Sequence, residues 1–161
     1  MILAWAAASI FLAAAGRDLG WRTIDHRLVI SLLLLWGGHA ALSSWGWQVA
    51  FGHLGTAMLA LLVSVLLYSL GWMGGGDVKL ATAVFLWAGP AHGIGILVLV
   101  TLAGGALAVL GLVACLMTRL PLPAWGMRGL GLISTERGVP YGVALAFGGI
   151  AAALSVPAGM G

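Results

Sequence analysis

Two aspartates, Asp18 and Asp77, are the residues of this chain best placed for chemistry. Asp18 ends the first long apolar stretch and Asp77 begins a later one, so a helix bundle can bring both to the same end. Two neighbouring carboxyl groups in a partly dehydrated site do not both ionise easily, so the pair can share a proton. The ionised member can take a proton from water while the protonated member polarises a carbonyl group. The pair predicts acid–base hydrolysis; the alternative is that each aspartate only pairs with a neighbouring arginine such as Arg17 or Arg22.

The composition predicts a polytopic membrane protein. Hydrophobic residues make up 62% of the 161 residues and charged residues 7%, whereas soluble domains contain roughly 25% charged residues. The net charge of +3 fits an excess of basic residues in loops on the inner side of a membrane. No basic run with interleaved aromatic residues predicts nucleic-acid binding. The single cysteine, Cys115, excludes an intramolecular disulfide and a cysteine-based zinc site.

Six apolar stretches predict an all-α bundle of about six transmembrane helices, forming a single membrane-embedded domain over residues 1–161. The stretches cover residues 1–16, 28–43, 50–72, 80–88, 93–117 and 139–158. The fourth is shorter than the ~20 residues that cross a bilayer, so it is either a span extended by residues 76–79 or a re-entrant hairpin. We favour the span, because a hairpin would place arginines on both sides of the membrane. The first stretch predicts an uncleaved helix, because its positive charge follows the apolar run.

The charged residues predict the orientation of the bundle. The seven basic and four acidic residues fall into three clusters, within residues 17–27, 77–79 and 119–137. Six spans place every cluster on the inner side and both termini outside, as the positive-inside bias requires. The tryptophans agree, except for Trp36: four are expected near the outer interface and three near the inner one, namely Trp5, Trp45, Trp47 and Trp87, and Trp21, Trp72 and Trp125.

Glycines predict close contacts between the later helices. Small residues let membrane helices approach where hydrophobicity does not drive their association. The residues concerned are Gly104, Gly105, Gly111, Gly142, Gly148 and Gly149.

A glycine-rich motif surrounds the second aspartate. The segment Gly74-Gly75-Gly76-Asp77-Val78-Lys79-Leu80 contains Gly-x-Gly-Asp, the signature of intramembrane-type aspartyl proteases. A glycine before the aspartate leaves the backbone open to a substrate peptide. Gly-x-Gly alone is common in a glycine-rich chain. Lys79, the apolar residues that follow and a partner aspartate on the same side make the match more specific.

On these residues the chain resembles the type IV prepilin peptidase family, in particular its short members that process Flp-type prepilins. The resemblance extends over nearly the whole length and includes Asp18-Leu19, residues 74–80 and Pro140-Tyr141-Gly142-Val143-Ala144. It implies that Asp18 and Asp77 are the catalytic aspartates. The residues that shape the site or bind substrate are then Gly74, Gly76, Lys79 and Tyr141. The activity implied is an aspartic endopeptidase of the bacterial inner (cell) membrane that cleaves prepilin leaders at the cytoplasmic face without a metal or other cofactor.

One segment departs from the family pattern. Ile24-Asp25-His26 stands where the family usually has Ile-Pro-Asn. Asp25 is therefore either a third carboxylate near the site or a solvated partner of Arg22 or Arg27. Longer family members carry a cysteine-rich zinc segment and an N-methyltransferase activity. Because this chain has one cysteine, we do not predict methylation.

Two other classes of function remain as alternatives. A proton-coupled transporter needs an essential acid near the middle of the bilayer, and none of the apolar stretches contains one. A non-catalytic subunit of pilus assembly would fit the departure at Asp25-His26. Three histidines, His39, His53 and His92, are expected near the outer face, where no carboxylate joins them to make a metal site. The expected partners are a prepilin-like substrate and the lipid bilayer, and the oligomeric state is not predicted.

Overall fold

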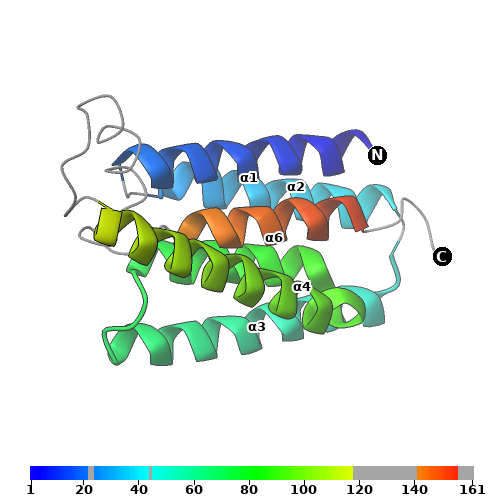
Figure 1. Cartoon of the computed structure of the whole chain (residues 1–161). Coiled ribbons are helices and arrows are strands. Elements are labelled where there is room, and N and C mark those ends of the chain that lie inside the picture. The colour runs from blue at the N-terminus through cyan, green and yellow to red at the C-terminus, as the bar shows by residue number, and fades with distance from the viewer. Residues whose placement is uncertain (22–23, 44, 118–140, 156–161) are drawn as a thin grey trace.

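The computed structural model describes residues 1–21, 24–43, 45–117 and 141–155, and these residues form a bundle of helices without strands. The helices are α1 (Ile2–Trp21), α2 (His26–Leu42), α3 (Trp47–Ser69), α4 (Gly75–Met117) and α6 (Tyr141–Ser155). They lie side by side along one direction (Figure 1). The all-α prediction is confirmed for this part of the chain.

Three of the helices are long and apolar enough to cross a membrane. The qualifying stretches are Ile2–Gly20, Trp47–Ser69 and Gly75–Leu116, while α2 and α6 are apolar but shorter. The membrane class is therefore supported by helix length as well as by composition. The number of crossings and the side on which the termini lie stay predictions.

Helix α4 consists of two halves that run in opposite directions. Gly89 interrupts it with φ 60° and ψ −175°, directly before Pro90. In Figure 1 the first half, residues 75–88, leads away from the loop after α3, and the second half, residues 90–117, returns to the same end. The short fourth stretch is thus extended toward its N-terminus, as expected, and it ends where the sequence placed a break.

His53 completes the hydrogen bonding at this turn. Pro90 has no backbone N–H, so the carbonyl of Leu86, four residues earlier, lacks its usual helical donor. Nδ1 of the buried His53 lies 2.8 Å from that carbonyl oxygen. Because a carbonyl only accepts, Nδ1 donates the hydrogen bond. The His53 ring also occupies the space where a side chain at residue 89 would begin, so both the positive φ and the packing require Gly89.

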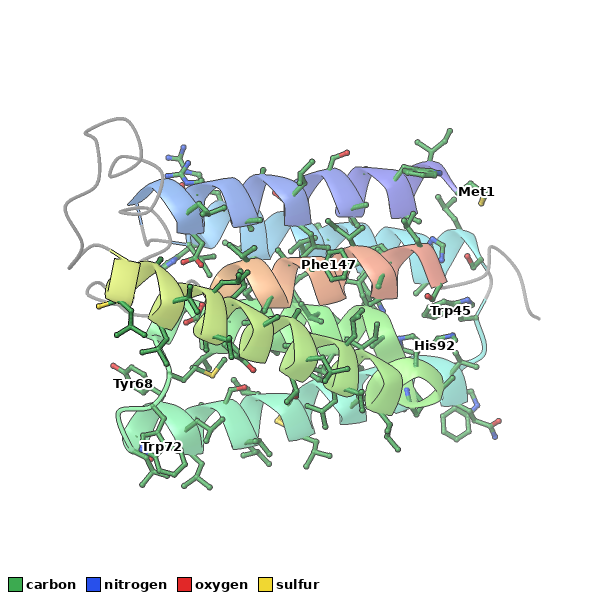
Figure 2. The ribbon with its side chains drawn as sticks, in the orientation of Figure 1. Met1, Trp45, Tyr68, Trp72, His92 and Phe147 are labelled. Carbon is green, nitrogen blue, oxygen red and sulfur yellow. The ribbon has the colours of Figure 1, made fainter. Side chains whose placement is uncertain are left out.

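We expect His53→Ala to destabilise the protein by about 1–3 kcal/mol, because the substitution leaves a buried carbonyl without a donor. Thermal unfolding in detergent measures the effect. The control is His92→Ala, which alters an exposed histidine at the same end of the bundle (Figure 2). Equal unfolding temperatures for the two variants would contradict the role given to His53.

An aromatic cluster fills the same end of the bundle. It comprises Trp36, His39, Trp45, His53 and Trp87, with ring centroids 4.7 Å apart for Trp45 and His53 and 5.8 Å apart for His39 and Trp87. Trp36, which fitted neither interface, belongs to this cluster. Trp87, which was expected near the outer interface, belongs to this cluster too, and its ring is fully buried in the protein: Nε1 donates to the carbonyl of Leu32, 3.1 Å away. Ring contacts therefore surround His39 and His53, and no metal-binding group of three is found among the described residues.

Helix α6 packs against both α1 and α4. At four of the predicted glycines of these helices an added Cβ would come unusually close to a neighbouring side chain: Gly104, Gly142, Gly148 and Gly149. At Gly149 that neighbour is the ring of Phe11, which is fully buried. Close packing through glycine is confirmed at these positions. The prediction of close packing is wrong for Gly105, where an added Cβ would meet nothing within 4 Å.

Candidate active site

Asp18 lies on the inward face of α1. Ala7, Phe11 and Ala14 are fully buried, and Asp18, four residues further on, is 6% exposed. This spacing of three and four residues places all four side chains on one face of a helix. The side chain of Arg17, one residue earlier, is 45% exposed. The helical period therefore turns the carboxylate inward and the neighbouring guanidinium outward.

Gly142, near the start of α6, provides the space that Asp18 occupies. A Cβ at residue 142 would lie 2.7 Å from Cγ and 2.8 Å from Oδ2 of Asp18, which is closer than real Cβ contacts. Seven residues along each helix, Gly149 meets Phe11 in the same way. The two contacts fix how α1 and α6 face one another.

A tight turn delivers Asp77 to the same end of the bundle. Helix α3 ends with Gly71 at φ 75°, and the N–H of Trp72 donates to the carbonyl of Leu67 at 2.9 Å, the pattern of a glycine C-cap. Helix α4 begins three residues later, and Asp77 lies in its first turn. The unpaired N–H groups of a helix N-terminus favour a negative side chain there.

Both glycines of the Gly-x-Gly-Asp motif have packing roles. A Cβ at Gly74 would lie 3.1 Å from Oδ2 of Asp77, and a Cβ at Gly76 would lie 3.3 Å from Cβ of Ile24. The carboxylate folds back over Gly74, as the acid of a capping box does. Access for a substrate was the expected reason for these glycines. The structure adds that the aspartate itself and the segment before α2 occupy the space that side chains would need.

Asp77 and Tyr141 line the same pocket. Its volume is about 970 Å³, and its walls come from α3, the loop after α3, both halves of α4 and the start of α6. The carboxylate of Asp77 is near enough to Tyr141 for its charge to act on the phenol. Asp18 contacts Gly142, and Asp77 lines this pocket together with Tyr141, the preceding residue of α6. Asp77 therefore lies at one end of an apolar pocket, and Asp18 is buried against the residue that follows Tyr141.

Comparison with known proteins identifies the family of this chain. The sequence profile of the type IV leader peptidase family matches residues 5–109, a range that contains Asp18 and the motif ending at Asp77. The chain belongs to the type IV leader peptidase family. Neither a curated protein nor a solved structure matches it. Membership confirms the resemblance found in the sequence and supports a leader peptidase-like function, whereas the roles of individual residues stay predictions.

In this chain Asp25 serves as the N-cap of α2. Its Oδ1 accepts a hydrogen bond from the backbone N–H of Arg27 at 3.0 Å, and its Oδ2 lies 3.9 Å from the guanidinium of Arg17. The hydrogen bond from Arg27, followed by the positive charge of Arg17, holds the pKa of the Asp25 carboxyl below its usual value. Asp25 was expected to be a third carboxylate of the site or a partner of Arg22 or Arg27. The structure gives it a capping role through the backbone of Arg27 and an ion pair with Arg17, while Arg22 lies outside the described residues.

Lys79 contacts the segment that departs from the family pattern. Its Nζ donates to Nε2 of His26 at 3.3 Å, and the lysine is exposed. The contact joins the start of α4 to the start of α2. Sequence reasoning missed this pairing of Lys79 with His26, and it treated Gly142 only as a packing residue. The contact of Lys79 with His26 has no local signal in the sequence, because the two residues are 53 positions apart. Gly142 did have a signal, because it lies in the segment 140–144 that resembles the family.

The remaining site predictions lie outside the described residues. They concern the third charge cluster, within residues 119–137, together with Arg22 and the side chains of Trp21 and Trp125. All the charged residues that the structure does describe belong to one end of the bundle, at the end of α1 and the starts of α2 and α4 (Figure 1): Arg17, Asp18, Asp25, Arg27, Asp77 and Lys79. The expected gathering of charge is therefore confirmed for the first two clusters.

Proposed function

We propose that this protein is a membrane aspartic endopeptidase that cleaves the leader from type IV, Flp-like prepilins. The observation that carries the proposal is that Asp18 contacts Gly142 while Asp77 lines a pocket with Tyr141, the preceding residue of α6, in a chain of the leader peptidase family. Both residues lie within the segment that matches the family. Gly74, Gly76, Lys79 and Tyr141 shape the site around them.

The two carboxyl groups divide the acid and base roles. The ionised carboxylate takes a proton from a water molecule, whose oxygen then attacks the carbonyl carbon of the scissile peptide bond. The protonated carboxyl donates to the carbonyl oxygen during the attack. When the carbon–nitrogen bond breaks, the amide nitrogen gains a proton and leaves as the new N-terminus. The half-buried position of Asp77 and the burial of Asp18 favour sharing of one proton between them.

We further propose that the aspartate end faces the cytoplasm, in the inner (cell) membrane of a bacterium. The basic residues Arg17, Arg27 and Lys79 belong to this end, which the positive-inside bias assigns to the cytoplasm. The basic leader of the precursor then stays in the cytoplasm and its apolar helix lies in the bilayer. The transporter alternative is disfavoured, because no charged residue of the described ranges lies midway along a helix of the bundle.

The proposal is tested by incubating the purified protein in lipid nanodiscs with Flp-like precursors. We expect mass spectrometry to find a free leader and a shortened pilin, with hydrolysis at one peptide bond. The precursor alone is the control for spontaneous cleavage. If every cognate precursor stays intact, the protein is a non-catalytic assembly subunit instead.

A further inference from the structure

We propose that the pocket beside Asp77 is a docking groove for the apolar helix that follows the cleaved bond of the precursor. The inference rests on the proposed function and adds where the substrate lies, which helices hold it and how much of it is bound. Its evidence is the shape of the pocket, its lining and the position of Asp77 at one end of it.

The groove is a wedge between α3 and the second half of α4. At its narrow end the two helices touch through small residues: a Cβ at Gly52 would lie 3.2 Å from Cγ of Pro90, and a Cβ at Gly93 would lie 3.3 Å from Cγ2 of Thr56. From there the helices diverge toward the aspartate end (Figure 1). The first half of α4 forms the floor between them, through Asp77, Ala81 and Phe85. The groove is therefore widest beside the carboxylate.

The length of the groove suits the beginning of a helix. Asp77 and Pro90 are lining residues at the two ends of the first half of α4. A rise of about 1.5 Å per residue makes the distance between them about 20 Å, which accommodates about 13 residues of a second helix. A bound helix would then be held from the cleaved bond to the contact between α3 and the second half of α4, and its remaining turns would extend beyond the groove.

The lining favours an apolar helix over the leader. Between the aspartate and Pro90 the walls carry leucines, valines and alanines, and of the described charged residues only Asp77 is among them. A basic leader would lose its hydration in such a groove without gaining partners. An apolar helix has no charged groups whose hydration would be lost. Small lining residues let its backbone approach closely, among them Ala60, Gly104, Gly105 and Ala108.

Gly105 and Gly95 form a matched pair for testing this groove. Both lie on the second half of α4, both are exposed, and an added Cβ at either would meet nothing within 4 Å. Gly105 lines the groove and Gly95 does not. Leucine at residue 105 therefore fills the groove without disturbing the packing of the protein, while leucine at residue 95 has the same helical and apolar character elsewhere.

The first experiment compares the cleavage kinetics of Gly105→Leu and Gly95→Leu in nanodiscs. We expect Gly105→Leu to raise the KM for an intact Flp-like precursor about tenfold or more, as loss of one well-packed contact does, while Gly95→Leu matches the wild type. Equal thermal unfolding of both variants checks the fold. Wild-type kinetics for Gly105→Leu would overturn the proposal, and so would a fall in kcat at unchanged KM, because the substitution would then act on the reacting groups.

A second experiment detects the docked helix without relying on cleavage. A photo-crosslinking benzophenone side chain replaces residue 105, or residue 95 as the control, in the Asp77→Asn protein. The probe is a synthetic peptide with a basic leader followed by an apolar helix. We expect crosslinking to the peptide at residue 105 and only background at residue 95. Crosslinking to lipid alone at residue 105 would overturn the proposal, because the groove would then be a lipid site.

The two experiments separate this inference from the proposed function. If the peptide crosslinks at residue 105 but the wild type cleaves no precursor, the groove stands and the peptidase assignment fails. If the wild type cleaves precursors while residue 105 neither crosslinks nor affects KM, the peptidase assignment stands and the groove fails.

Discussion

Asp18→Asn and Asp77→Asn are each expected to lower the rate of precursor cleavage by about 10²–10⁴-fold, the usual contribution of a general acid or base. Asparagine keeps the size and shape of aspartate but neither takes a proton from water nor shares one with its partner. Because Asp18 is buried against Gly142 and Asp77 folds back over Gly74, a change of shape would confuse the result, and the amide avoids it. The measurement is the single-turnover cleavage rate in nanodiscs.

Asp25→Asn is the matched control for this pair. Asp25 belongs to the same end of the bundle and caps α2 through its Oδ1, and asparagine caps a helix about as well as aspartate. The substitution removes only the exposed contact of 3.9 Å with Arg17, and exposed ion pairs contribute little. We expect Asp25→Asn to cleave at the wild-type rate. If Asp18→Asn and Asp77→Asn did the same, the aspartic mechanism would be wrong.

Gly142→Ala is expected to reduce kcat by about 10²-fold, an effect typical of a displacement of about 1 Å at a reacting group. The new methyl group would lie 2.7 Å from Cγ of Asp18. Aspartate is too short for its far end alone to move aside, so the carboxyl group shifts or α6 moves away from α1. Either change separates Asp18 from the part of α6 on which Asp77 acts. Cleavage kinetics in nanodiscs, compared with thermal unfolding, measure the result.

Two other glycines separate displacement of the site from loss of packing. Gly149→Ala collides with the ring of Phe11 on the same contact between α1 and α6, and overpacking of this kind destabilises by about 1–3 kcal/mol. Gly16→Ala, two residues before Asp18, meets nothing within 4 Å. We expect Gly149→Ala to lower the unfolding temperature with kcat kept in the protein that remains folded, and Gly16→Ala to change neither. A drop in kcat for Gly149→Ala as large as for Gly142→Ala would contradict the local role of Gly142.

The sequence predicted the helices and the end at which the aspartates gather, because both follow from hydropathy and charge. Asp18 and Asp77 each adjoin a long apolar stretch, so a bundle has few ways to separate them. The break at Gly89-Pro90 was also visible, since proline interrupts a helix. Family membership then supported the interpretation of Gly-x-Gly-Asp as a peptidase motif.

The faces of the helices could not be predicted, because nearly every face is apolar. In a soluble helix the polar side shows which residues point outward, but exposed Leu62 and buried Ser64 of α3 invert that expectation. The burial of Trp87 inside the bundle was therefore not predicted. The groove could not be predicted for the same reason, because its walls consist of the same types of apolar residue as the surfaces around it. Gly105 and Gly142 look alike in the sequence, and only the structure shows that Asp18 packs against Gly142 while nothing packs against Gly105.

The joint between the halves of α4 has a consequence for acid tolerance. The donor to the Leu86 carbonyl is Nδ1 of His53, and a histidine carries a proton on that nitrogen both as the imidazolium ion and in one neutral tautomer. The bond is therefore compatible with either charge state of the ring. Acidification would keep this hydrogen bond, but it would place a positive charge on a ring that is buried at the turn of α4.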